Sequence, residues 1–311
     1  MIDPQGLAKF TDHDVILEPD EDTPEWWAGA PSVARAADGT FVLAARMREG
    51  HSPRGRRGYE VRLLQSDDGI HFQPLKSIPR ESIPIPGFER PALVRDPKAG
   101  TFKLYLCGPW QDGPWCILKL DDADDPADFA PETCRPTLTA AHCGCAGVVQ
   151  FKDPFVAYLE GRYHMLVIGC QSEVERTYHF TSDDGETWEP VGRGLAFECA
   201  GWHNFYTRPA CLVPMGVGHL FVYEGSHNTW HDPPYNIATG FAYTLDLKTF
   251  TDLTPSEPAL KSTTPGDYHT WRYSHWLWVG DELWAYAECA RPNNTNEIRL
   301  FRRPRPSPDP G

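Results

Sequence analysis

Carboxylates stand at the ends of several short apolar runs in this chain, where a fold could gather them. The four candidates are Glu89, Asp153, Glu224 and Glu288. Cleavage of a glycosidic bond needs two carboxyl groups across the scissile bond. One is protonated to release the alcohol, and the other is ionised to activate water or to attack the anomeric carbon. If the fold brings these four together, they can supply such a pair.

Aromatic and hydrogen-bonding residues occupy the same kind of position. Aromatic rings offer an apolar face to a sugar, while arginine, asparagine and histidine satisfy its hydroxyl groups in fixed directions. The candidate substrate-binding residues are Trp26, Trp27, Arg46, Arg90, His203, Asn204, Tyr206, Arg208, His227, His269 and Arg272. Each also has a structural interpretation, because arginines pair with neighbouring acids and tryptophans cap cores.

Three of these arginines, Arg90, Arg208 and Arg272, stand at the entries of apolar runs that we interpret as equivalent. Arginines brought together near one axis are costly unless acids or an anion neutralise them. Two interpretations are open. The arginines pair with the four carboxylates in a structural network, or they bind a carboxylate or phosphate of the substrate, for which their planar fork is suited.

The elements that position these residues repeat along the chain. A glycine-containing turn followed by an alternating or apolar run occurs five times, with spacings of 57 to 62 residues between its glycines, Gly39, Gly100, Gly161, Gly218 and Gly280. One strand-like run precedes each of these phrases and another follows it. Five repeats of three or four antiparallel strands predict an all-β fold, a five-bladed β-propeller.

Closure of the ring needs a strand from the N-terminus. The fifth repeat runs out of chain near Phe301, before an outer strand, and residues 12–19 have strand character. We predict that they complete the last blade, which leaves no unpaired edge. Residues 1–303 then form a single propeller domain, and residues 304–311 form a proline-rich tail.

Topology explains why the candidates should meet. In an up-and-down blade the second strand runs antiparallel to the innermost one, so it returns to the face of the ring where the first began. Starts of first strands and ends of second strands therefore surround one mouth. The candidate residues lie at these positions, so we expect one site that binds a small carbohydrate.

Composition excludes several classes of function. The net charge is −14, from 43 acidic and 29 basic residues, and no basic stripe is present for nucleic acid. The chain contains no run of about 18 apolar residues, so no membrane span is predicted. The start of the chain lacks the pattern of a secretion signal, and most of its nine cysteines lie in apolar runs, so we expect reduced thiols and a cytoplasmic protein.

No cofactor or metal is expected. The run His142-Cys143-Gly144-Cys145 lacks a second close pair at zinc spacing. His227 and His231 would share a ligand only on a helix, and they stand in a sequence typical of a loop. The oligomeric state stays open.

Two stretches carry a family resemblance. The run Lys152-Asp153-Pro154-FVAYLEGRYHMLVIG resembles the Asp-Pro strand of five-bladed glycosidases, the arabinanase, β-xylosidase and invertase/levanase group. In that group the aspartate stabilises the transition state or tunes the acid. The first repeat, GAPSVARAADGTFVLAAR followed by SDDGIHF, is similar to the opening blade of β-mannosidases and mannoside phosphorylases. The resemblance implies a five-bladed glycosidase fold over essentially the whole chain.

Three positions depart from those families. Ala30 stands where the arabinanase-like group has its base, Glu89-Arg90-Pro91-Ala92 where the phosphorylases have a proton donor, and Thr207-Arg208-Pro209 where an acid glutamate is expected. Only Asp153 carries over residue by residue. A shared fold therefore does not transfer a known mechanism.

These observations lead to a functional expectation with two alternatives. We expect a glycoside hydrolase acting on a small oligosaccharide, in which Asp153 and two of Glu89, Glu224 and Glu288 provide acid, base and orienting functions. The first alternative is phosphate-dependent cleavage, with the three arginines holding phosphate. The second is a non-catalytic sugar-binding propeller that has lost its base.

Overall fold

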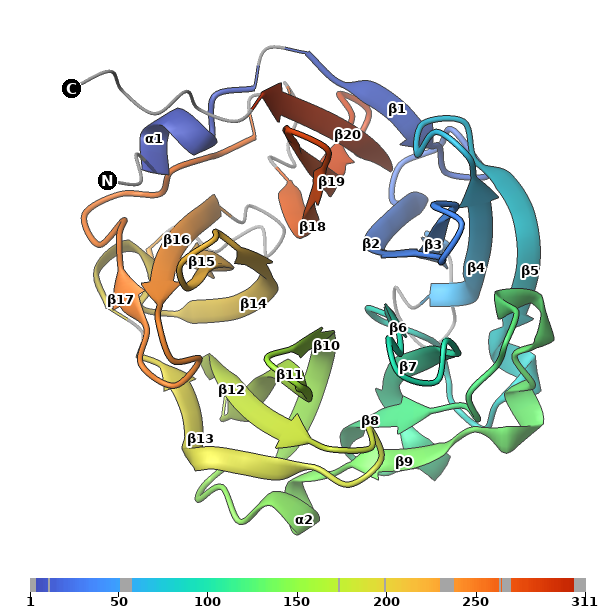
Figure 1. Cartoon of the computed structure of the whole chain (residues 1–311), viewed down its shortest axis with the longest axis horizontal. Coiled ribbons are helices and arrows are strands. Elements are labelled where there is room, and N and C mark those ends of the chain that lie inside the picture. Colours follow the sequence, from blue (N-terminus) through green and yellow to red (C-terminus); the bar gives the residue numbers. More distant parts are fainter. Residues whose placement is uncertain are drawn as a thin grey trace.

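The computed structural model describes residues 4–10, 12–50, 58–172, 174–198, 200–229, 238–262, 264 and 270–304. Its strands form three hydrogen-bonded sheets, of eight, eight and four strands, which divide into antiparallel blades. The blades are arranged in a ring (Figure 1). The predicted all-β, five-bladed propeller is confirmed. Helices are limited here to single turns, α1 (Pro4–Leu7), α2 (Ala140–Cys143) and the 3-10 turns η1 (Arg80–Ser82), η2 (Trp110–Asp112), η3 (Pro126–Asp128), η4 (Pro131–Thr133) and η5 (Gly201–His203).

Four blades are continuous in the sequence. The first contains β2 (Trp27–Arg35), β3 (Phe41–Arg48), β4 (Gly58–Ser66) and β5 (Gln73–Pro79). The second contains β6 (Ala92–Arg95), β7 (Phe102–Pro109), β8 (Trp115–Lys119) and β9 (Arg135–Leu138). The third contains β10 (Gln150–Leu159), β11 (Arg162–Gln171), β12 (Val174–Ser182) and β13 (Glu189–Phe197). The fourth contains β14 (Tyr206–Pro214), β15 (His219–Ser226), β16 (Ala238–Thr244) and β17 (Thr251–Asp252).

The fifth blade closes the ring. It contains β18 (Trp271–Val279), β19 (Glu282–Ala290) and β20 (Asn296–Pro304), and its outer strand is β1 (Asp14–Leu17). β1 pairs antiparallel with β20, with Asp14 opposite Leu300. The prediction that residues 12–19 complete the last blade is therefore confirmed. The proline-rich tail lies outside the described residues from position 305 onward.

Single parallel pairs join some neighbouring blades near the start of their inner strands. Trp27 pairs with Asn296 between blades one and five, and Tyr206 pairs with Glu175 between blades four and three. The apolar cores lie between blades, where Phe41 of blade one stacks on Trp284 of blade five at 5.7 Å between ring centroids. Each blade is thus held by burial against the next one.

The repeated Ser-Asp-Asp-Gly turn also fastens one blade to its neighbour. In blade one the Ser66 hydroxyl accepts a hydrogen bond from the Gly69 N–H at 2.9 Å, and Tyr286 of blade five donates to the Gly69 carbonyl at 2.7 Å. In blade three the Gly185 carbonyl accepts from Tyr105 of blade two at 2.8 Å. Both glycines have positive φ and lie against these tyrosines, so a side chain there would clash.

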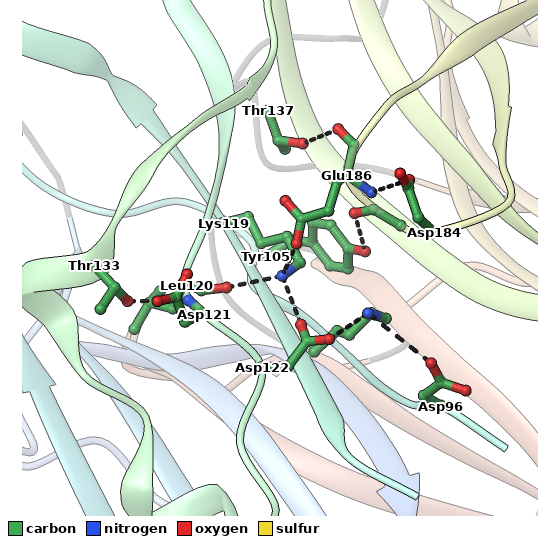
Figure 2. A network of polar contacts seen from close by, with 12 residues as sticks. Asp96, Tyr105, Lys119, Leu120, Asp121, Asp122, Thr133, Thr137, Asp184 and Glu186 are labelled. Atoms are coloured by element: carbon green, nitrogen blue, oxygen red, sulfur yellow. Dashed lines mark hydrogen bonds and ion pairs between the residues drawn. The ribbon is translucent and has the colours of Figure 1, made fainter. Parts of the chain in front are cut away.

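A charged network joins blades two and three (Figure 2). The fully buried Lys119 lies between Asp122 at 2.6 Å and Glu186 at 2.5 Å, and it also donates to the Leu120 carbonyl at 2.9 Å. Lys103 pairs with the same Asp122, and Glu186 also contacts Arg135 at 3.1 Å. Buried charges of this kind are stable only while their partners are in place.

No helix in the described part of the chain is long and apolar enough to cross a membrane.

Replacing Lys119 tests this network. Lys119→Met keeps most of the apolar stem and removes the charge that Asp122 and Glu186 share, so we expect the free energy of unfolding to fall by about 2–4 kcal/mol. Arg162→Ala is the control, because it breaks an exposed ion pair with Asp183 and should cost less than about 1 kcal/mol. Urea denaturation of both variants gives the comparison. Equal losses would show that the buried network does not hold the two blades together.

Candidate active site

The inner strands begin with a bulge, and its register defines which residues are equivalent. In blades one, three, four and five, one extra residue stands on the inner strand close to its start. In blade two the Glu89 N–H donates to the Cys107 carbonyl, and Ala92 pairs with Tyr105, which gives the same count. The equivalent residues, each three positions before regular pairing resumes, are Gly29, Glu89, Lys152, Arg208 and Arg272.

This register corrects one expectation. Arg208 and Arg272 are equivalent, but Arg90 lies one residue further along its strand, at the position of Asp153 and Tyr273. Both Arg90 and Arg208 precede a proline, so the sequence aligns them. The bulge in blade four falls after Pro209 and displaces the alignment by one residue. We use the term entry end for the end of the ring where inner strands begin and second strands finish.

Both carboxylate oxygens of Glu288 accept hydrogen bonds at the entry end. It is fully buried, and its Oε1 accepts from Arg272 at 2.8 Å and from Asn296 at 2.7 Å. Its Oε2 accepts from Arg46 at 3.0 Å and from the Ala30 N–H at 3.0 Å. Burial raises the pKa of Glu288, but Arg272 and Arg46 outweigh that effect and hold it below its usual value. The carboxylate therefore orders two arginines.

Glu89 pairs with Arg46 on the other side of that guanidinium. About a tenth of its side chain is exposed, so it lies nearer to solvent than Glu288. Burial acts to raise its pKa, but Arg46, with further positive charge from Arg48 and Lys152, lowers the pKa to about 2. Glu89 is thus an ionised carboxylate at neutral pH.

Asp153 is buried at the bulge of blade three in a left-handed conformation, with φ of 52°. Its Oδ2 accepts from the Tyr273 hydroxyl at 3.0 Å and its Oδ1 from the Arg90 N–H at 3.3 Å. The Arg90 guanidinium donates instead to the carbonyls of Pro209 and Ala210 at 2.7 and 2.6 Å. Arg90 therefore ties blade two to blade four by binding backbone carbonyls.

Glu224 differs from the other three carboxylates. It is fully buried, and its Oε1 accepts from the Ser274 N–H at 3.2 Å. Its Oε2 has no hydrogen-bond partner among the residues that the structure describes. Burial raises the pKa of Glu224 to about 7, although the charge of Arg90 opposes the rise. This group holds a proton at pH values where Glu89 is ionised.

The remaining candidates fall into two groups. Trp27 is buried beneath the guanidinium groups of Arg48 and Arg272, at 4.4 and 5.3 Å. His203 is buried in blade four between Thr207 at 2.9 Å and Asp252 at 3.1 Å, so it belongs to the packing of that blade.

Four others keep some exposure. Trp26 contacts Tyr59 edge-on at 5.8 Å, and Tyr206 lies under Arg208 at 4.3 Å. Asn204 accepts from the Asn228 N–H at 3.1 Å, and His227 contacts Thr229. His269 and His231 lie outside the described residues.

Three residues of the site were missed by the sequence analysis. Glu175 pairs with Arg208 and lies 3.7 Å from the Lys152 ammonium. Tyr273 and Asn296 hold Asp153 and Glu288. Glu175 and Asn296 begin third strands, which start near the same end of the ring. The starts of third strands therefore also predict site residues, and they include Glu175 and Asn296. The signal for Tyr273 is its alignment with Asp153.

Comparisons with known proteins identify the fold. No protein-family model and no curated protein matches the chain. Solved structures do match over nearly the whole length. One described as a glycoside hydrolase has a TM-score of 0.72 at 16% identity, covering 98% of this chain and 97% of its own. The β-1,2-mannobiose phosphorylase from Listeria innocua, in complex with β-1,2-mannobiose, has a TM-score of 0.64 at 13% identity, covering 93% and 94%.

A third match comes from work on the GH130 family of mannoside phosphorylases, which contains glycoside hydrolases that target β-1,2 mannosidic linkages in Candida mannan. Its TM-score is 0.67 at 16% identity, and the match covers 94% of each chain. The chain therefore has the fold of propeller glycoside hydrolases and mannoside phosphorylases, which confirms the suspected resemblance at the level of structure. Identities this low carry no activity or residue role from those proteins to this one.

The buried carboxyl of Glu224 should make stability depend on pH. Its pKa lies above the usual value of 4.5, so the folded state binds the proton more tightly than the unfolded state does. Wild-type stability contributed by this proton is complete below about pH 4.5 and is lost as pH rises through 7. Position 224 cannot titrate in Glu224→Gln. The free energy of unfolding of this variant, relative to that of the wild type, should therefore rise by roughly 1–3 kcal/mol between pH 5 and pH 8.

Urea unfolding at both pH values measures this difference. The exposed Glu257→Gln serves as the matched control and should follow the wild type. Parallel pH dependence in the Glu224→Gln and wild-type proteins would mean that Glu224 is ionised throughout.

Proposed function

We propose that this protein is a carbohydrate-active enzyme that cleaves a glycosidic bond by hydrolysis. The observation that carries the proposal is the difference in ionisation between two carboxyl groups at one end of the ring. Glu89 has a pKa of about 2 and Glu224 a pKa of about 7. Environments that push two carboxyl pKa values apart provide an ionised group and a protonated one at the same pH, as glycoside cleavage requires.

The geometry suggests a role for each carboxylate. Glu89, ionised and nearest to solvent of the four, is suited to activate water or to attack the anomeric carbon. Glu224 holds the proton. Asp153, fixed by Tyr273 and by the Arg90 N–H, presents a carboxylate of defined orientation. Glu288 is bonded on both oxygens and acts by orienting Arg46 and Arg272.

Partly exposed aromatic and amide groups support a sugar as the substrate. Trp26 and Tyr206 can offer ring faces or edges, and Asn204 can bond hydroxyl groups. The fold is shared with a glycoside hydrolase and with a phosphorylase crystallised with β-1,2-mannobiose. A small mannoside is therefore the first substrate to try.

Phosphorolysis is the second candidate, and one feature favours it. Lys152 and Arg208 both contact the carboxylate of Glu175, so two positively charged side chains lie close together in that part of the entry end. Of the three arginines considered for phosphate, Arg90 binds backbone carbonyls and Arg272 binds Glu288. A phosphate site would thus depend on Arg208 and Lys152.

Product analysis with and without phosphate distinguishes the two reactions. We expect β-1,2-mannobiose or an aryl glycoside to give free sugars at a rate that phosphate does not increase. A phosphate requirement with a sugar 1-phosphate product would replace hydrolysis by phosphorolysis. Binding of the sugars without any cleavage would identify a carbohydrate-binding propeller instead.

Asp153→Asn tests the site itself. The amide keeps the shape of the carboxylate and removes its charge, so turnover should fall at least about 100-fold while the protein stays folded. Asp183→Asn, on an exposed turn, is the matched control and should retain full turnover. Steady-state kinetics on the best substrate provides the measurement. Near-normal turnover in folded Asp153→Asn would remove this residue from the reaction.

A further inference from the structure

Three consecutive residues of β18 bond three carboxyl groups that come from three different strands. The Arg272 guanidinium donates to Glu288 of β19 at 2.8 Å. The Tyr273 hydroxyl donates to Asp153 of β10 at 3.0 Å, and the Ser274 N–H donates to Glu224 of β15 at 3.2 Å. One short segment of blade five therefore holds carboxylates that belong to blades three, four and five.

The backbone of this segment matches that of two other blades. Tyr273 has φ of 51°, and the equivalent residues Ala30 and Asp153 both have φ of 52°. A proline follows each of those two, Pro31 and Pro154. Proline is thus compatible with the bulge, and blade five has serine at position 274 where blades one, two and three have proline.

The departure has a chemical consequence. Proline has no N–H, so it could not donate the hydrogen bond that Glu224 accepts from position 274. Oε2 of Glu224 has no hydrogen-bond partner among the described residues, and the Ser274 N–H is the donor that its Oε1 has. A buried polar group with so few partners depends strongly on the one it has.

Two equivalent arginine–glutamate pairs differ in what bonds the glutamate, and the difference explains why Glu224 depends on the Ser274 N–H. Arg272 stands opposite Glu288 and bonds it, whereas Arg208 stands opposite Glu224 in the same register and bonds Glu175 instead. The carboxylate of blade five is held by its own arginine. The carboxylate of blade four is held by the backbone of blade five.

Tyr273 is itself fixed by its surroundings. Its ring lies close to the guanidinium groups of Arg272, Arg46 and Arg90, at 4.8, 5.5 and 5.9 Å. Cations over an aromatic face hold the ring by electrostatic attraction. The hydroxyl group is thereby directed at Asp153.

We propose that the segment Arg272-Tyr273-Ser274 is a positioning element for the reaction, in which Ser274 through its N–H and Tyr273 through its hydroxyl fix Glu224 and Asp153. The inference rests on the proposed function, in which these two carboxyl groups take part. The N–H of Ser274 bonds the charged form of Glu224 and so limits the rise in its pKa that burial causes. The group can then release its proton near neutral pH.

Two variants of Ser274 separate the N–H from the side chain. Ser274→Pro removes the donor, and Ser274→Ala keeps it while removing the hydroxyl that accepts from the Trp276 indole at 2.8 Å. The readout is an infrared titration of the protonated carboxyl band, assigned to Glu224 by its loss in Glu224→Gln. We expect the midpoint to rise above about 7 in Ser274→Pro and to stay in place in Ser274→Ala. Equal midpoints in the two variants would overturn the role of the N–H.

Tyr273→Phe tests the second contact and does not depend on the folding of the proline variant. Loss of one hydrogen bond to a carboxylate should lower kcat about tenfold and leave KM unchanged. The same change in the Asp153→Asn background should have no further effect, because the two residues act as one unit. Tyr286→Phe, which loses a buried hydrogen bond to Gly69, is the control for a purely structural loss.

The outcomes distinguish this inference from the proposed function. Equal losses from Tyr273→Phe in the wild-type and Asp153→Asn backgrounds, or the same loss from Tyr286→Phe, would overturn the positioning role of Tyr273. If the wild-type protein cleaves no glycoside, the proposed function fails, while the infrared titration still decides whether Ser274 controls the ionisation of Glu224.

Discussion

The carboxylate of Glu288 is the interaction on which the entry end of the ring depends. It is buried where blades one and five meet, and it bonds Arg46, Arg272 and Asn296 as well as the backbone at Ala30. A charge that is removed from water is stable only when its partners satisfy it completely, and here both oxygens are satisfied. Arg46 then binds Glu89, and both Arg46 and Arg272 lie close to the ring of Tyr273. One ion cluster therefore sets the arrangement of the residues around it.

The bulges at the starts of the inner strands determine which side chains point toward this ion cluster. A regular strand alternates its side chains between two faces, whereas one extra residue turns the chain and changes which side chain points inward. Asp153, Ala30 and Tyr273 occupy this position with positive φ. Gly29, just before the bulge, leaves room for the Glu288 carboxyl, since a side chain there would collide with it. Backbone irregularity and charge pairing thus specify the same site.

The blades that carry the candidate site are also joined to each other at their outer parts. Tyrosines reach from one blade to the glycine turn of the next, and Lys119 joins blades two and three. These contacts fix the distance between inner strands that share no hydrogen-bonded ladder, such as β6 and β10. Catalytic constellations that come from several strands need such support, because small displacements are costly to the chemistry.

The sequence by itself determined the propeller, its five blades and its closure by residues 12–19, because strand patterns and glycine turns act locally and repeat. It also brought Glu89, Asp153, Glu224 and Glu288 to one end of the ring, since antiparallel topology dictates where strands start and finish. Only the tertiary structure decided which partners each of them bonds. Arg208 pairs with Glu175, on the third strand of another blade, rather than with Glu224, which stands opposite it on its own blade. Such contacts join residues 33 to 120 positions apart, and both pKa values and hydrogen bonding follow from burial and distance, which no local pattern encodes.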